Sequence, residues 1–176
     1  MDEFVTDIAE LRRRAREHIA QGPITAAYGA DRERVIAVLN EALATELVCV
    51  LRYKRHYFTA TGLDAGPVTA EFLQHATEEQ QHADQIAARI TQLQGSPNFD
   101  PEGLTSRSHS QYDASVGLRD MIVEDLVAER IAIASYSEII RWLGDGDPTT
   151  RRMLEFILSV EEEHADDLLG LLDRLP

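Results

Sequence analysis

The sequence EQQHAD at residues 79–84 returns as EEEHAD at residues 161–166, and this repeated segment decides the fold. In each copy a glutamate stands three residues before a histidine, a spacing that puts both side chains on one face of an α-helix. A carboxylate and an imidazole on one face can bind the same metal ion. The two copies therefore predict two helices that face each other across a site large enough for two ions.

The repeat extends upstream of both copies. Glu46 lies 33 residues before the first copy and Glu129 lies 32 residues before the second, about one long helix in each case. Each of these glutamates is followed seven residues later by a tyrosine, Tyr53 or Tyr136. The chain is therefore expected to contain two related halves that carry the same side chains in the same order.

Apolar residues recur at intervals of three and four in five stretches, and no stretch alternates with the period of two that a strand needs. The predicted fold class is therefore all-α. Residues 1–30 are expected to form a helical extension and residues 31–175 a four-helix bundle, within a single domain 1–176. The expected helices span residues 2–20, 31–60, 67–95, 115–143 and 149–174.

The connections between these helices predict how the bundle is wound. Residues 96–114 hold two prolines, a glycine and several serines, and they form the one long connection. The connections before residue 67 and around residues 144–148 are short, so the first and last helix pairs are expected to be antiparallel hairpins. Two hairpins joined by one long crossover are typical of a ferritin-like bundle.

Glu46 and Glu129 fall among the apolar positions of their helices and are expected to point inward. Burying a carboxylate without a partner costs several kcal/mol, so cations must balance these acids. Oxygen-rich ligation with two histidines suits iron or manganese better than structural zinc. We expect two ions, with Glu79 and Glu161 bridging them. The predicted ligands are Glu46, Glu79, His82, Glu129, Glu161 and His164.

Several other residues are expected to support the site or the fold without binding metal. Tyr53 is the preferred candidate to donate an electron or to hydrogen-bond a bound oxygen species. Asp125 is a candidate to accept the free ring N–H of a ligating histidine. Cys49 is expected to be a small buried apolar residue and Trp142 to be a packing residue. Expected surface residues are His75, Glu78, Glu162 and Glu163.

Composition limits the functions that the chain can have. The formal net charge of -14 argues against broad binding to nucleic acid or to an anionic membrane. No apolar run approaches the length of a bilayer span, so a cytoplasmic protein is expected. With a single cysteine the chain has no intrachain disulfide, and it has no Cys-x-x-Cys pair for zinc or rubredoxin-type iron.

The motifs around Glu46, Glu79-x-x-His82, Asp125-x-x-x-Glu129 and Glu161-x-x-His164 resemble those of the bacterioferritins, and the likeness covers residues 35–170. The resemblance implies a ferroxidase centre inside each subunit, where Fe(II) is oxidised by O2 or H2O2. It also implies that the ferric product is deposited as mineral in a hollow shell. All six predicted ligands match ligand positions of that family.

The chain departs from the bacterioferritins in ways that resemble the mini-ferritins of the Dps type. Gln80 stands where bacterioferritins place the methionine that ligates haem, so haem is not expected. Only twelve residues follow His164, too few for the fifth helix of the 24-subunit shells. The extra N-terminal helix and the longer crossover favour a homo-oligomeric shell of twelve subunits. Dps-like proteins with this kind of centre often carry a cysteine pair, which Cys49 alone cannot supply.

Two alternative functions remain open from the sequence. A rubrerythrin-like or manganese-catalase-like peroxidase would use the same six ligands without storing mineral. Whatever the function, two iron ions per subunit are expected, with manganese or zinc as possible replacements. A DNA-protecting protein of the Dps type is supported only by the arginines at positions 12, 13, 14 and 16. Because residues 1–30 hold four arginines and five acids, DNA binding is not expected.

Overall fold

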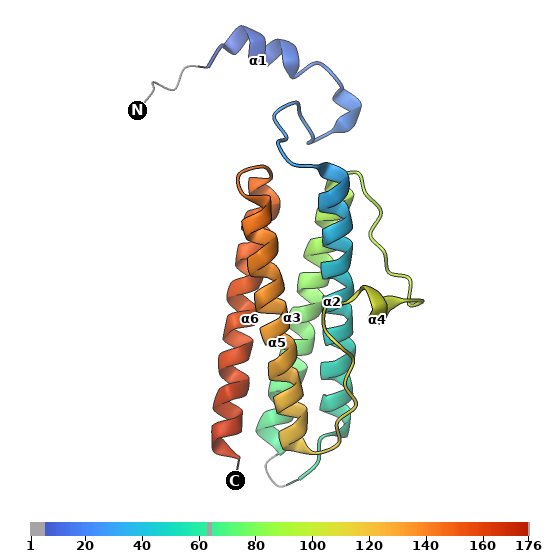
Figure 1. Cartoon of the computed structure of the whole chain (residues 1–176), viewed down its shortest axis with the longest axis vertical. Coiled ribbons are helices and arrows are strands. Elements are labelled where there is room, and N and C mark those ends of the chain that lie inside the picture. The colour runs from blue at the N-terminus through green and yellow to red at the C-terminus, as the bar shows by residue number, and fades with distance from the viewer. Residues whose placement is uncertain (1–5, 63–64, 176) are drawn as a thin grey trace.

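The computed structural model describes residues 6–62 and 65–175, and throughout these residues the only regular structure is helical (Figure 1). This confirms the predicted all-α class. None of the helices in this described part is long and apolar enough to span a membrane. The elements in chain order are α1 (Ile8–Arg14), the 3-10 helix η1 (Ile19–Gln21), α2 (Arg32–Thr59), α3 (Ala65–Gln92), α4 (Leu104–Arg107), α5 (Leu118–Leu143) and α6 (Pro148–Arg174).

Four long helices form the bundle, in which α2 packs chiefly on α3 and α5 on α6 (Figure 1). Their ends differ from the predicted ends by no more than three residues. Asp31 caps α2 as its sequence position suggests, because its side chain accepts a hydrogen bond from the backbone N–H of Arg34 at 3.1 Å. Pro148 begins α6 in the first helical turn, where its missing N–H costs nothing.

The crossover from α3 to α5 runs along α2, whose polar side chains hold its backbone (Figure 1). Asn40 accepts a hydrogen bond from the backbone N–H of Asn98 at 2.7 Å. Arg52 donates to the carbonyl of Gln111 at 2.7 Å, and Arg55 donates to two carbonyls shortly before α5. Outside the short helix α4, these bonds replace the regular hydrogen bonding that the proline- and serine-rich segment lacks.

Buried apolar side chains form two separate clusters along the bundle. The first includes Leu43 and Ile157 and extends toward the α5–α6 turn. The second includes Tyr53 and Leu168 and extends toward the α2–α3 turn. Glu46 lies between these clusters on α2, so a layer of buried polar side chains separates two apolar ones.

The N-terminal segment differs from the prediction. A helix was expected over residues 2–20, but α1 covers seven residues and ends before His18, which adopts a left-handed φ of 52°. Residues 2–5 of that predicted helix lie outside the described residues. Ile8 and Leu11 are 58% and 51% exposed, so the expected apolar face contacts little of this chain. Trp142 is also 49% exposed, which corrects its prediction as a packing residue.

Asp147 joins the start of α6 to two other parts of the fold. Its carboxylate accepts a hydrogen bond from the backbone N–H of Thr150 at 2.9 Å and so caps α6. The buried guanidinium of Arg89 on α3 donates to both carboxylate oxygens, at 2.9 and 3.1 Å. Tyr28, which precedes α2, donates its hydroxyl at 2.9 Å. One carboxylate therefore anchors the N-terminal segment, α3 and the α5–α6 turn.

Replacing Asp147 by asparagine should lower the free energy of unfolding by roughly 3 kcal/mol at pH 7, because it leaves Arg89 without a counter-charge. Asparagine still caps helices well, so the loss reports the charge and not the cap. Burial alone would raise the pKa of Asp147, but hydrogen bonds from Thr150, Tyr28 and Arg89 lower it below its usual value. Urea unfolding of the metal-free protein measures the difference.

Urea unfolding at acidic pH tests whether the charge of Asp147 causes the loss of stability. A carboxylate with a lowered folded-state pKa stabilises fully above its unfolded pKa of about 3.9, and this stabilisation is lost as the pH falls through the folded pKa. The difference between the native protein and D147N should therefore shrink below about pH 4. A difference that stays constant across this range would show that charge is not responsible.

Candidate metal centre

The six predicted ligand side chains converge in the polar layer at the middle of the bundle, and each residue is at most 2% exposed. The two outer glutamates come from α2 and α5. The two Glu-x-x-His pairs come from α3 and α6, as their spacing predicts. By helix, the side chains are Glu46 from α2, Glu79 and His82 from α3, Glu129 from α5, and Glu161 and His164 from α6.

Two groups of potential ligand atoms share two glutamates. The first group comprises Glu46, Glu79, His82 and Glu161, and the second replaces Glu46 and His82 with Glu129 and His164. Within each group, one ligand atom from every residue lies within 4.8 Å of the others. Such an arrangement could offer one outer glutamate and one histidine to each of two ions, with Glu79 and Glu161 available to both.

Glu79 and Glu161 each direct one oxygen toward each histidine. Toward His82 Nδ1, the distances are 2.9 Å from Glu161 Oε1 and 3.7 Å from Glu79 Oε2. Toward His164 Nδ1, they are 3.5 Å from Glu79 Oε1 and 3.6 Å from Glu161 Oε2. Carboxylates in this position can bridge two ions, with one oxygen serving each.

Many polar atoms in the centre lack hydrogen-bond partners, counting all partners that the described residues offer. A buried acceptor without a partner costs about 1–3 kcal/mol, so a cluster of them calls for cations. Carboxylate oxygens with imidazole nitrogens are a suitable donor set for iron, manganese or zinc. The unpartnered atoms are Glu46 Oε2, Glu79 Oε1, His82 Nδ1, Glu129 Oε2, Glu161 Oε1 and Oε2, and His164 Nδ1.

Without metal, protons must balance the buried charge. Burial and the neighbouring carboxylates raise the pKa of Glu79 and Glu129 well above the usual value. Burial would lower the pKa of both histidines, but adjacent carboxylates, chiefly that of Glu161, raise it to about 12 for His82 and about 9 for His164. Metal binding must therefore displace protons from this cluster.

Two tyrosines hold the outer glutamates in a reciprocal arrangement. Tyr53 of α2 donates its hydroxyl to Glu129 of α5, and Tyr136 of α5 donates its hydroxyl to Glu46 of α2. Both tyrosines are buried, and burial raises the pKa of both well above the usual value. The seven-residue spacing noted in the sequence therefore positions both tyrosines, although only Tyr53 was preferred.

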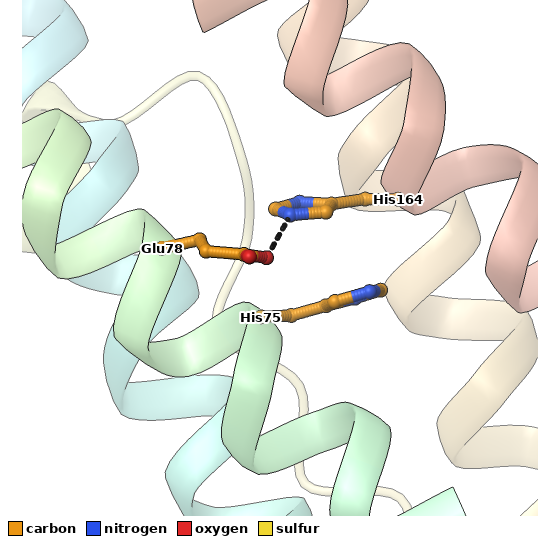
Figure 2. A group of neighbouring side chains, drawn as sticks. All are labelled: His75, Glu78 and His164. Atoms are coloured by element: carbon orange, nitrogen blue, oxygen red, sulfur yellow. Dashed lines mark hydrogen bonds and ion pairs between the residues drawn. The ribbon is translucent and has the colours of Figure 1, made fainter.

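Glu78, and not Asp125, contacts the outer nitrogen of a predicted ligand. His164 Nε2 lies 2.8 Å from Glu78 Oε2 (Figure 2), whereas its Nδ1 lies 3.5 Å from Glu79 Oε1 in the centre. A carboxylate in this position fixes the orientation of a metal-binding imidazole. The Glu78 side chain is 32% exposed, so this residue lies at the surface as predicted while it also contacts His164, and Glu162 and Glu163 are exposed as expected.

Asp125 is buried but serves a different network. Its carboxylate accepts a hydrogen bond from Arg52 Nε at 3.1 Å and pairs with His56 Nδ1 at 2.8 Å. Both partners lie on α2, so Asp125 links α2 to α5. This corrects its prediction as the partner of a ligating histidine. Cys49 is 3% exposed and its thiol pKa is raised by burial, in agreement with its prediction as a buried residue.

His75 is fully buried, which contradicts its prediction as a surface residue. Its ring stacks on His164 with ring centroids 3.9 Å apart (Figure 2). It also meets the Tyr53 ring edge-on, with centroids 5.2 Å apart. Burial and the neighbouring His164 lower the pKa of His75 to about 3, so the imidazole is neutral at pH 7. His75 stands four residues before Glu79, and this helical spacing could have identified it.

Comparison with known proteins gives related sequences and folds. Residues 36–176 match the Ferritin family, described as a ferritin-like domain. A bacterioferritin of Rhodobacter capsulatus is 30% identical over 146 residues, which cover 81% of this chain and 86% of that protein. The dodecameric thioferritin of Bacteroides fragilis, a bacterioferritin-related protein, has a TM-score of 0.79 and 33% identity over 82% of this chain and 88% of that chain.

A Dps protein of Thermosynechococcus elongatus has a TM-score of 0.76 over 80% of this chain and 90% of that chain. At 20% identity this likeness concerns the fold alone.

Replacing Glu79 by glutamine should leave the metal-free protein at least as stable as the native one, because the change removes a buried acid from a crowded cluster. It should weaken stabilisation by metal, since a neutral amide cannot bridge two cations. At a thousandfold excess over its dissociation constant, Co(II) should stabilise the native protein by about 4 kcal/mol, and E79Q should lose about half of this or more.

Thermal unfolding with and without Co(II) measures both effects. The matched control is Glu162→Gln, which makes the same change at an exposed position on α6. It should keep the full cobalt-dependent shift. Equal shifts in the two variants would contradict the assignment of Glu79 as a ligand.

Proposed function

The chain belongs to the ferritin-like domain family, and we propose that it is a ferroxidase that oxidises Fe(II) with O2 or H2O2 and stores the ferric product. The proposed reaction site is the dinuclear centre within each subunit. The observation that carries the proposal is the set of unpartnered carboxylate and imidazole atoms in the described part of the bundle, with Glu79 and Glu161 shared between two groups. Relatives named bacterioferritin support an iron-storage role.

Each ligand has a separate task in this proposal. Glu79 and Glu161 would be shared between two iron ions. His82 and Glu46 would hold one ion, and the corresponding pair from α5 and α6 would hold the other. The iron would supply the redox chemistry, with each Fe(II) giving one electron to O2 or H2O2 and becoming Fe(III). The two apolar clusters on either side exclude bulk water, which strengthens electrostatic interactions within the centre.

Tyr53 acts in this proposal through Glu129. Its hydroxyl proton is committed to the Glu129 carboxylate, and its raised pKa keeps it protonated at neutral pH. Tyr53 therefore orients this glutamate while the charge of the centre changes. The same argument applies to Tyr136 and Glu46. Electron donation by Tyr53 stays a prediction.

The assembly and cofactor content follow from the same reasoning. The similar Bacteroides fragilis protein is dodecameric, which supports a homo-oligomeric shell of twelve subunits for this chain in preference to one of 24. Two iron ions per subunit are proposed, with manganese or zinc as alternative occupants. Haem is not part of the proposal, because the Gln80 amide hydrogen-bonds Asp84 and provides no thioether sulfur.

Iron oxidation and storage are tested together. Fe(II) is added to the metal-free assembly, followed by O2 or H2O2, and ferric absorbance and the mass of the assembly are recorded. The native protein and E162Q should oxidise iron and retain many more than two irons per chain. E79Q should oxidise it at least about tenfold more slowly, because ligand geometry controls such centres.

The number of irons retained per chain also distinguishes an iron-storing ferroxidase from a peroxidase that stores no mineral. Rapid consumption of peroxide with only two metals retained per chain would favour a rubrerythrin-like or manganese-catalase-like peroxidase. E79Q that oxidises iron at the native rate would refute the proposed site.

Direct DNA binding is not part of the proposal, because neighbouring acids partly neutralise the arginines of α1. Arg13 pairs with Glu10 at 2.7 Å and also with Glu17, and Arg14 lies 3.4 Å from Glu10. Phosphate binding needs accessible positive charge. We therefore predict no gel shift of linear DNA by the assembled protein even at low salt. A salt-sensitive shift would reopen the DNA-protecting alternative.

A further inference from the structure

A second group of potential metal ligands lies outside the six residues of the dinuclear centre. It comprises Glu71 and His75 of α3 and Asp167 of α6. His75 Nε2 lies 3.4 Å from Glu71 Oε1 and 3.8 Å from Asp167 Oδ2. Figure 2 shows the His75 ring stacked beside the ring of His164 from α6. The group therefore adjoins the centre without sharing a residue with it.

The hydrogen bonds of His75 determine which of its nitrogens is free. His75 Nδ1 lies 3.2 Å from the Tyr53 hydroxyl oxygen. The single hydroxyl proton of Tyr53 is donated to Glu129, so the oxygen must accept a hydrogen from His75 Nδ1. In the neutral imidazole this leaves Nε2 with a lone pair, which is the form that binds metal.

That lone pair faces two carboxylates and has no hydrogen-bond partner anywhere in residues 6–62 and 65–175. His75 itself is 0% exposed, so water does not surround the ring. An acceptor nitrogen beside two anionic groups is a repulsive arrangement. A cation between them would turn each repulsion into an attraction and would satisfy the nitrogen.

We propose that Glu71, His75 and Asp167 bind a third divalent transition-metal cation, separate from the dinuclear centre. One imidazole with two carboxylates suits Fe(II), Mn(II), Co(II) or Zn(II) better than Mg(II) or Ca(II), which take oxygen ligands. The Glu71 and Asp167 side chains are 28% and 43% exposed, so the site is open to ions from outside the bundle. The proposal goes beyond the proposed function, because it requires neither iron oxidation nor storage.

Another nearby group, His75 with Glu78 and His164, is a weaker candidate. His164 Nε2 is already engaged by Glu78 at 2.8 Å, and His164 Nδ1 faces the dinuclear centre. Glu78 and His164 therefore belong to the centre described above. The link from the third site to the centre runs instead through His75 Nδ1, the Tyr53 hydroxyl and Glu129.

The test counts ions bound to the metal-free assembled protein. Co(II) is added by equilibrium dialysis with excess Mg(II) to occupy exposed acids, and cobalt per chain is measured by elemental analysis. The native protein should bind three ions per chain and Glu71→Gln/Asp167→Asn should bind two. The control Glu162→Gln/Asp166→Asn removes the same charge from exposed positions of α6 and should bind three.

Cobalt-soaked crystals locate the ion. An anomalous peak is expected about 2.1 Å from His75 Nε2, and it should be absent in the double variant of Glu71 and Asp167. Saturation of the native protein at two ions, or three ions in that variant, would overturn the proposal. Three bound ions without Fe(II) oxidation would instead refute the proposed function and leave the third site standing.

Discussion

The structure depends on the burial of four carboxylates and two imidazoles in one layer at the middle of the bundle. An unbalanced charge in such a place costs several kcal/mol, so the side chains must face one another closely enough to share cations or protons. Long helices meet this need, because each is packed along many turns and therefore holds its inward side chains in a fixed direction. The apolar clusters on both sides of the layer keep the helices in register and exclude water.

The two halves of the chain support each other across this layer and not only within each hairpin. Tyr53 of the first hairpin holds Glu129 of the second, and Tyr136 of the second holds Glu46 of the first. Each half therefore needs the other to position its own terminal glutamate. This reciprocity gives a physical reason for the same seven-residue spacing in both halves, and it makes docking of the hairpins a condition for a complete centre.

Helical periodicity predicted the four bundle helices and brought all six proposed ligands to one place, because spacing determines which face of a helix a residue occupies. It could not determine which neighbouring helix that face meets. Asp125 lies one turn before Glu129, yet the guanidinium of Arg52 on α2 engages it. The prediction of a helix over residues 2–20 was wrong for another reason. An amphipathic helix is stabilised when its apolar face packs on another surface, and Leu11 on this face remains 51% exposed.

The proposed third site of Glu71, His75 and Asp167 has no counterpart in the second half of the chain. The two ends of the proposed dinuclear centre therefore differ. The offset of 82 residues that relates Glu79 to Glu161 relates His75 to Ile157. Ile157 is fully buried in the first apolar cluster, whereas His75 faces the partly exposed carboxylates of α3 and α6. At one end of the proposed dinuclear centre the apolar packing is therefore continuous. At the other it is interrupted by His75, whose ring stacks on His164 and whose Nε2 faces carboxylates that are 28% and 43% exposed.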